Sequence, residues 1–146
     1  MDSITTALPI YLEMGVKKKS TFSLNLNEYR NAHYQILNKA KILFTELVSK
    51  RIADYPAMKR VRLDYALFFG SKRAVDVANV CCIVDKFFCD TLVNCGKVPD
   101  DDWRIISNVA YAWGGIDTHH PHVELTLSEI ELSVETRGSE HAQRVL

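Results

Sequence analysis

The stretch KRVRLDYALFF (residues 59–69) decides the fold, because apolar and polar side chains alternate along it. This period of two is typical of a β-strand with one buried face. The apolar side carries Val61, Leu63, Tyr65, Leu67 and Phe69. Arg60 and Arg62 project together from the opposite side, and a Gly70-Ser71 break ends the pattern. We therefore predict a strand over residues 59–69 that forms one wall of the core.

The segment that follows has helical periodicity from about Val77 to Cys95, and Gly96 is a natural stop for a helix. Its apolar stripe consists of Val77, Val80, Cys81, Val84, Phe87, Phe88 and Leu92. Another face carries Asn79, Cys82, Lys86 and Asp90 at steps of three and four. We expect this helix to pack on the strand that precedes it.

The N-terminal half predicts two strands and a helix. Residues 7–14 and 21–26 read as strands of a hairpin around the basic turn Lys17–Lys19. A helix follows from Asn27 to the residues before Tyr55-Pro56, and Asn25 with Glu28 resembles a capping box. Its apolar stripe is Tyr29, Ala32, Ile36, Ala40, Leu43, Leu47 and Val48. Its opposite face carries Arg30, Lys41, Lys50 and Arg51.

The C-terminal part predicts two further strands. The first has Val109, Tyr111 and Trp113 on one face and runs to Gly114-Gly115, and the second covers residues 123–127. The predicted order is β β α β α β β, an α/β (α+β) fold with one small mixed sheet of four to five strands and two main helices. We expect residues 1–132 to form this domain and residues 133–146 to be a polar, frayed tail.

Composition is that of one soluble globular domain. The chain has 146 residues, of which 47% are hydrophobic and 25% charged, enough to bury a sizeable core. It has no run of about 18 apolar residues, and its first lysines follow the apolar patch, the reverse of a secretory signal. We therefore expect no membrane association and a location in the cytoplasm, which is that of the bacterial host if the chain is phage-encoded. Because the cytoplasm is reducing, the four cysteines are expected to be thiols: Cys81, Cys82, Cys89 and Cys95.

The net charge of zero conceals an uneven distribution. Residues 15–73 hold thirteen basic and four acidic side chains, a balance of +9. Residues 74–146 hold five basic and twelve acidic side chains, a balance of −7, and Asp2 and Glu13 supply the remaining −2. Such asymmetry suggests a polyanion-facing surface beside a carboxylate cluster, with solvated faces that bind no partner as the alternative.

Aspartates and basic residues are interleaved between residues 72 and 102. Mg²⁺ takes oxygen ligands and is usually held by one or two carboxylates plus substrate phosphates, so this pattern favours a metal-dependent nuclease. A lysine beside the metal neutralises charge that develops on the phosphate. The structural alternative is that Asp76 caps a helix and that Asp100–Asp102 form a solvated turn.

The same stretch resembles the RusA-like Holliday-junction resolvases of phages and prophages, which are small dimeric α/β endonucleases. The family motif runs Asp-x-Asp-Asn, then a helix with Lys and Asp-x-Leu, then Gly followed by Asp-Asp. Matching residues here are Asp76, Asn79, Lys86, Asp90-Thr91-Leu92, Gly96 and Asp100-Asp101. The N-terminal half is similar only in element order and basic character.

The resemblance implies cleavage of four-way junctions and related branched DNA, in recombination or repair, by a homodimer that uses Mg²⁺, or Mn²⁺ as a substitute, and no small-molecule cofactor. It implies that Asp76 and Asp101 ligate the metal, that Lys86 assists at the phosphate, and that Asp100 or Asn79 supports the site. Asp100 and Asp85 are further candidate ligands, and Asp90 is a further supporting residue. The residues expected to contact DNA are Lys17, Lys18, Lys19, Arg60, Arg62, Lys72 and Arg73.

Two departures from the motif favour an alternative function. Ala78 stands where the family has its second Asp, and the Asn-to-Lys separation is seven instead of three, which displaces Lys86 by about 6 Å along the helix. If the helix is continuous, Asp85 lies about 13 Å from Asp76 along the axis, too far to share an ion. The alternative is a catalytically impaired homologue that binds DNA junctions or a protein partner.

Two other site types are weaker interpretations. A zinc site would use the cysteines or the cluster His119, His120 and His122, but the chain has no Cys-x-x-Cys pair and these histidines fall in a predicted turn. Cys/His catalysis lacks a cysteine at a helix N-terminus. His33 borders an apolar stripe, where a packing role is expected.

Overall fold

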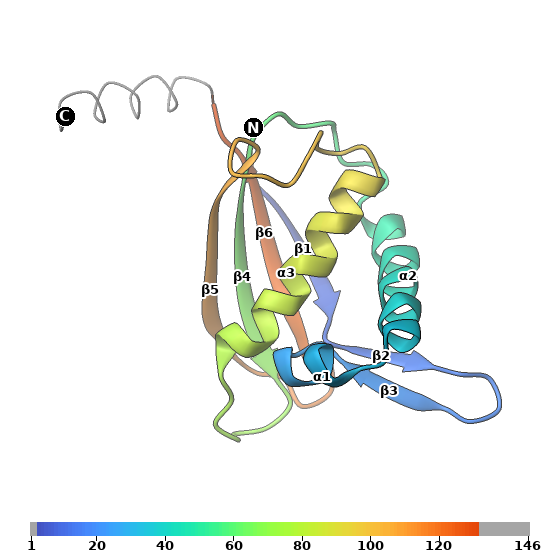
Figure 1. Cartoon of the computed structure of the whole chain (residues 1–146). Helices are drawn as coiled ribbons and strands as arrows, with labels where there is room; N and C mark the ends of the chain where they lie inside the picture. The colour runs from blue at the N-terminus through green and yellow to red at the C-terminus, as the bar shows by residue number, and fades with distance from the viewer. Residues whose placement is uncertain (1–2, 132–146) are drawn as a thin grey trace, which may run out of the picture.

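The computed structural model describes residues 3–131, so the C-terminal tail predicted from residue 133 lies outside the described residues. It contains strands of four to eleven residues, two long helices and one short helix (Figure 1). In chain order the elements are β1 (Ile4–Pro9), β2 (Tyr11–Met14), β3 (Ser20–Ser23), α1 (Leu26–Asn31), α2 (Tyr34–Arg51), β4 (Val61–Phe69), α3 (Val77–Asn94), β5 (Ile106–Ile116) and β6 (His122–Glu129).

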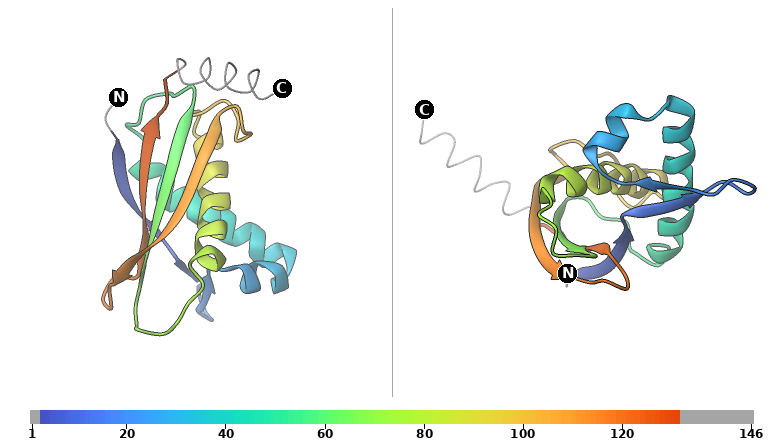
Figure 2. Two further views of the ribbon diagram at one scale, coloured as in Figure 1. Left: turned by 90° about the vertical axis from the view of Figure 1, so that its left-hand side faces the viewer. Right: turned by 90° about the horizontal axis from the view of Figure 1, so that it is seen from below.

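A four-stranded mixed sheet has the order β1-β6-β4-β5 (Figure 2). β4 is central and pairs in parallel with β5, to which α3 forms the connection, and antiparallel with β6. In this register Tyr65 lies opposite Tyr111 on one side and Leu125 on the other. β2 and β3 form a separate hairpin. The predicted α/β class with a small mixed sheet and two main helices is confirmed.

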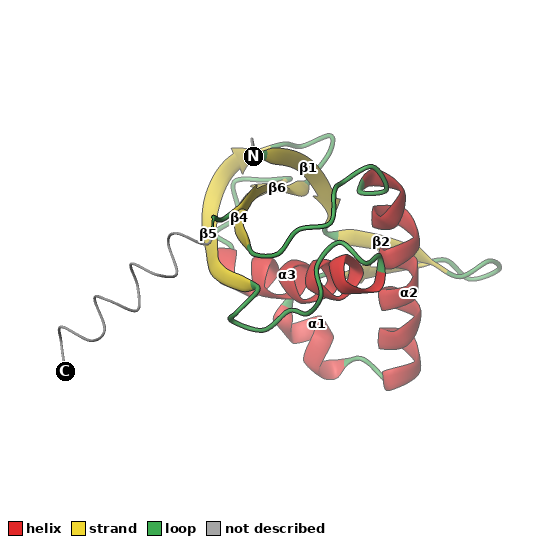
Figure 3. Cartoon of the chain, turned by 90° about the horizontal axis from the view of Figure 1, so that it is seen from above, coloured by secondary structure: helices red, strands yellow, loops and turns green. Residues whose placement is uncertain are grey.

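All three helices lie on one side of the curved sheet (Figure 3). α3 packs on β4 and β5, whereas α2 packs on α3 and reaches β1 and β2. The Phe87 ring of α3 lies at the centre of the helical layer, with ring centroids 5.5 Å from Phe44 and 6.4 Å from Phe22. Burial of these large rings joins both helices and the hairpin into one core.

The apolar stripe predicted on α3 is confirmed. Six of its members are buried: Val80, Cys81, Val84, Phe87, Phe88 and Leu92. The helix is continuous for eighteen residues and is capped by Asp76, whose carboxylate accepts the Ala78 N–H at 3.1 Å. Side-chain acceptors at this position satisfy amides that have no intrahelical partner.

Two elements predicted as continuous are each divided in two. The strand predicted over residues 7–14 ends at Pro9, which lacks the N–H needed to continue a ladder, and resumes as β2. The helix predicted from Asn27 is interrupted because Ala32 is extended and His33 caps a new helix, accepting the Gln35 N–H at 3.2 Å. This restart moves the buried stripe of α2 to Ala40, Phe44 and Val48.

The predicted cap of the first helix is confirmed, since Asn25 Oδ1 accepts the Glu28 N–H at 2.8 Å. The Glu28 carboxylate accepts the N–H of Ser23, and not that of Asn25 as in a standard capping box. Across residues 3–131, no helix has the length and apolar character needed to cross a membrane.

Candidate functional site

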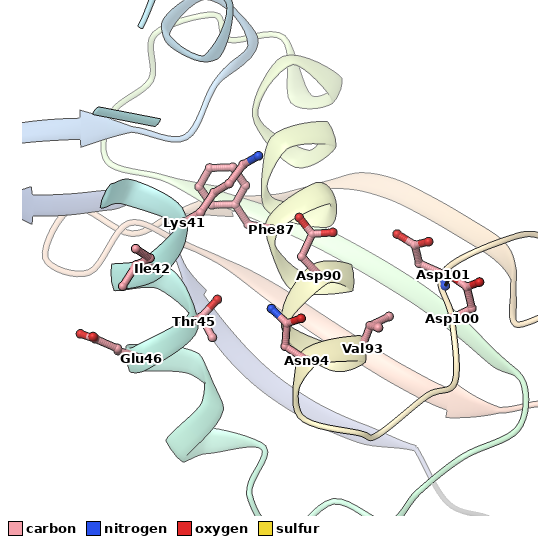
Figure 4. A pocket seen from close by; sticks show the side chains of 10 residues that line it. All are labelled: Lys41, Ile42, Thr45, Glu46, Phe87, Asp90, Val93, Asn94, Asp100 and Asp101. Carbon is pink, nitrogen blue, oxygen red and sulfur yellow. Dashed lines mark hydrogen bonds between the residues drawn. The ribbon is translucent and has the colours of Figure 1, made fainter. Parts of the chain in front are cut away.

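A cavity of about 580 Å³ lies between α2, α3 and the loop after α3. Figure 4 shows Asp90 on α3 between Lys41 of α2 and the loop that carries Asp100 and Asp101. Thr45 and Glu46 complete the wall formed by α2. The cavity therefore brings together three of the sequence-predicted site residues, Asp90, Asp100 and Asp101, with a basic group from a helix that the motif does not include.

The end of α3 positions the two loop aspartates. Gly96 has φ +70°, a left-handed conformation that reverses the chain and that glycine adopts without strain. The Lys97 N–H then donates to the Leu92 carbonyl at 2.9 Å, and Lys97 Nζ donates to the carbonyls of Ala53 and Tyr55 at 2.9 and 2.8 Å. These contacts hold the start of the loop, so Asp100 and Asp101 return toward the last turns of the helix.

Asp101 has the perturbed carboxyl group of this site. Partial desolvation, a hydrogen bond with Asp100 and the negative charges of Asp100 and Asp90 all raise the pKa of Asp101 above its ordinary value. Asp102 differs, because it pairs with Arg104 at 2.7 Å and its pKa is lowered by that hydrogen bond. The carboxylates of Asp100 and Asp101 therefore repel one another, and a cation bound between them would relieve that repulsion.

Two lysines lie close to the Tyr29 ring, and one of them, Lys41, lines the cavity. The Nζ atoms of Lys41 and Lys86 lie 5.9 and 5.8 Å from the centre of the Tyr29 ring, within the range of a cation–π contact. Lys86 lies one turn before Asp90 on α3, so the two share a helix face. Lys41 therefore brings one positive charge to the cavity that Asp90, Asp100 and Asp101 line.

The opposite end of α3 holds the first part of the predicted motif. Asp76 is the N-cap, and fourteen residues of continuous helix place it about 21 Å along the axis from Asp90. Asn79 lines a different cavity of about 560 Å³, together with Arg73 and residues of α1. Within one chain the structure therefore separates Asp76 and Asn79 from the Asp90, Asp100 and Asp101 cluster.

Asp85 faces the sheet and is enclosed by hydrogen-bond donors. Its Oδ1 accepts the Tyr65 hydroxyl at 2.7 Å and the Cys89 thiol at 3.3 Å, and its Oδ2 lies 3.4 Å from the Tyr111 hydroxyl. Burial, followed by the charge of Asp85, raises the pKa of both tyrosines and of Cys89. The Asp85 carboxylate thus connects α3 to β4 and β5 through hydrogen bonds. Asp85 and Asp90 are five residues apart on α3 and therefore point to different sides of the helix.

The basic residues predicted to contact DNA are distributed over several elements. Lys17, Lys18 and Lys19 occupy the β2–β3 turn, and Lys72 and Arg73 occupy the β4–α3 loop, both toward the lower end of Figure 1. Arg60 and Arg62 lie at the start of β4, where Arg62 pairs with Asp64 at 2.9 Å and Arg60 Nε donates to Ser107 Oγ at 3.2 Å. Within residues 3–131, these basic side chains do not form one patch around the cavity.

The donor set at the cavity suits a hard divalent cation. No group of three His, Cys, Asp or Glu side chains within residues 3–131 is arranged to hold a metal ion. Mg²⁺ is, however, commonly held by one or two carboxylates, with water and substrate phosphate completing its shell. Asp100 and Asp101 supply that number of oxygen ligands at adjacent positions.

The four cysteines are free thiols, as predicted, and burial raises the pKa of Cys81 to about 12. His119 and His120 are exposed, whereas His122 stacks on Phe68 with ring centroids 4.9 Å apart.

Comparison of the sequence with models of known protein families, and with curated proteins, finds no match.

Proposed function

We propose that this chain is a metal-dependent endodeoxyribonuclease that cleaves branched DNA such as four-way junctions. The observation that supports the proposal is the cavity where Asp90, Asp100 and Asp101 meet Lys41. The class of substrate rests on the motif resemblance of residues 76–102 to RusA-like resolvases. The site is proposed at the C-terminal end of α3, and Asp76 lies outside it within one chain.

Four residues that line the cavity, together with Lys86 on the neighbouring turn of α3, have roles in this proposal. Asp100 and Asp101 would hold Mg²⁺, which when bound supplies Lewis-acid activation of the phosphodiester and of a water molecule. Lys86 and Lys41 bind the non-bridging phosphate oxygens and offset the charge that accumulates on them. Asp90 is the further carboxylate at the cavity and accepts a proton from the attacking water.

A second candidate is a binder of branched DNA that does not cut it. Two observations favour it: the described residues contain no three-ligand group, and Ala78 removes one carboxylate of the motif. In this function the acidic cavity would be a remnant, and affinity would come from the basic residues of the β2–β3 turn and the β4–α3 loop.

One experiment tests both candidates. Labelled four-way junction and a linear duplex of the same sequence are incubated with the full chain in Mg²⁺, in Mn²⁺ and in EDTA, and the products are separated on denaturing and native gels. Nicking of the junction that requires the metal supports the nuclease. A retarded junction without nicking supports the binder, and neither nicking nor retention at modest salt contradicts both.

A further inference from the structure

The cavity of about 560 Å³ that Asn79 lines lies at the other end of α3 from the proposed nuclease site. It is enclosed where four parts of the chain meet, namely the β2–β3 hairpin, α1, the loop after β4 and the first turn of α3, toward the lower end of Figure 1. Its volume is that of a site for a small organic ligand. None of its lining residues belongs to the cavity of Asp90, Asp100 and Asp101.

The apolar part of this cavity consists of core side chains and two aromatic rings. Ile10, Leu24 and Val80 line it and are buried in the core. Tyr11, which is 40% exposed, and the partly buried Phe69 line the same space. A flat heteroaromatic ring suits such surroundings, because its faces pack against apolar and aromatic groups while its polar atoms lie along its edge.

Carboxamides supply most of the polar part. Asn27 and Asn31 of α1 and Asn79 of α3 line the cavity. Within residues 3–131 their side chains form no hydrogen bond with another group of the chain, whereas Asn25, which also lines the cavity, caps α1 with its oxygen. A carboxamide offers a donor and an acceptor side by side, which is the pattern that pairs with N6 and N7 of adenine. The cavity therefore combines a place for a ring with groups that bind the edge of a purine.

Arg73 brings one positive charge to the cavity. Among residues 3–131 it is the only lysine, arginine or histidine that lines this space, and its guanidinium forms no ion pair in that part of the chain. Glu28 is the one carboxylate of the lining, and it accepts the N–H of Ser23. A guanidinium binds a phosphate group through paired hydrogen bonds, and a single cation matches a single phosphate. A nucleic-acid strand would instead require a groove with several basic side chains.

We propose that this cavity binds a free purine nucleoside monophosphate, with adenine as the base. The ring packs among the aromatic and aliphatic side chains, the carboxamides of Asn31 and Asn79 bind its edge, and Arg73 pairs with the phosphate. The inference is independent of the proposed nuclease activity, because it requires neither branched DNA nor a divalent metal.

A ¹H–¹⁵N NMR titration of the full chain with adenosine monophosphate (AMP) tests the site. The side-chain amide signal of Asn79 should shift with a dissociation constant below about 1 mM, and that of Asn94, at the opposite end of α3, should not. Adenosine and uridine monophosphate should bind at least about tenfold more weakly, because the first lacks the phosphate and the second lacks the adenine edge. No response of the wild-type chain to about 5 mM AMP would overturn the proposal.

Two pairs of variants locate the ligand. Arg73→Gln is expected to weaken AMP binding by about tenfold or more, and Lys72→Gln, which removes the same charge from the neighbouring position outside the cavity, by less than about twofold. Asn79→Ala should weaken binding by about fivefold, and Asn94→Ala should leave it unchanged. Alanine favours a helix, so Asn79→Ala remains informative if Arg73→Gln fails to fold. Equal effects within either pair would contradict the proposed site.

A single-stranded oligodeoxyadenylate of about eight nucleotides distinguishes a free nucleotide from a nucleotide within a strand. The proposal predicts that this strand binds no more tightly than AMP, since the cavity has one cation and no basic groove. Tighter binding of the strand, weakened equally by Arg73→Gln and Lys72→Gln, would contradict a site for a free nucleotide.

Discussion

Replacing Tyr65 by phenylalanine tests whether Asp85 serves the fold. Tyr65 is 1% exposed in the central strand, and its hydroxyl donates to Asp85 Oδ1 at 2.7 Å. Phenylalanine keeps the ring and its packing but removes this donor. The variant therefore isolates one hydrogen bond between α3 and the sheet.

The expected cost follows from the geometry. Hydrogen bonds to charged groups contribute about 1.5–3 kcal/mol, and a short O–H···O contact lies in the stronger part of that range. Asp85 retains the Cys89 thiol at 3.3 Å, which offsets part of the loss. We expect Tyr65→Phe to lower the free energy of unfolding by about 2 kcal/mol.

Urea unfolding followed by circular dichroism measures this change, and Tyr111→Phe is the control. The Tyr111 hydroxyl lies 3.4 Å from Asp85, beyond the usual length of such a bond, so this variant should lose less than about 0.5 kcal/mol. Thermal unfolding of Tyr65→Phe should show a Tm lower by roughly 6–8 °C. Losses of equal size in both variants, or no loss in Tyr65→Phe, would refute the structural role of Asp85.

Four further predictions concern the site, the core and a helix cap. Asp100→Asn should lower the pKa of Asp101, because it removes a neighbouring negative charge, and carboxyl ¹³C NMR titration measures this shift. The folded state raises the pKa of Asp101, so this group lowers the free energy of unfolding as the pH rises from its ordinary pKa through the raised one. Asp101→Asn removes the titrating group and should make the free energy of unfolding fall less over that pH window. Urea unfolding at several pH values measures the difference. Phe44→Ala should cost about 3–5 kcal/mol, because Phe44 is fully buried against Phe87, and a cost below about 1 kcal/mol would contradict that packing. Asn25→Ala should cost about 1 kcal/mol through the lost cap, and Asn25→Asp should retain most of it, both measured by thermal unfolding.

The sequence predicts α3 and β4 well because their buried side chains recur at the regular spacing of a helix and of a strand. Val80, Val84 and Phe88 recur along one face of the helix, and Leu63 and Leu67 alternate on the strand. The sequence does not predict where α2 begins, because the extended Ala32 that separates it from α1 leaves no gap in the apolar pattern. The exposure of β5 could not be predicted, because Val109 and Trp113 alternate as in a buried strand and only the position of β5 at the sheet edge exposes them.

The candidate site was predicted in part. Asp100 and Asp101 follow a helix stop at Gly96, and this order predicts that they lie near the end of the helix that carries Asp90. The sequence predicts Lys41 on the polar face of the first long helix, but its place in the same cavity as Asp90 depends on how α2 packs on α3, which no local pattern encodes. Residue spacing gives the distance of Asp76 from Asp90 along a continuous helix, but the position of Asp101 depends on the path of the loop after α3, which required the structure.

The nicking of a four-way junction in Mg²⁺ by the wild-type chain, Asp101→Asn and Asp76→Asn tests the proposed position of the site most directly. Both substitutions are isosteric, and asparagine still caps α3 at position 76. With the site at the C-terminal end of α3, Asp101→Asn should abolish nicking while junction binding persists, and Asp76→Asn should nick at a rate near that of the wild type. Full activity of Asp101→Asn, or loss of nicking in Asp76→Asn alone, would contradict the account.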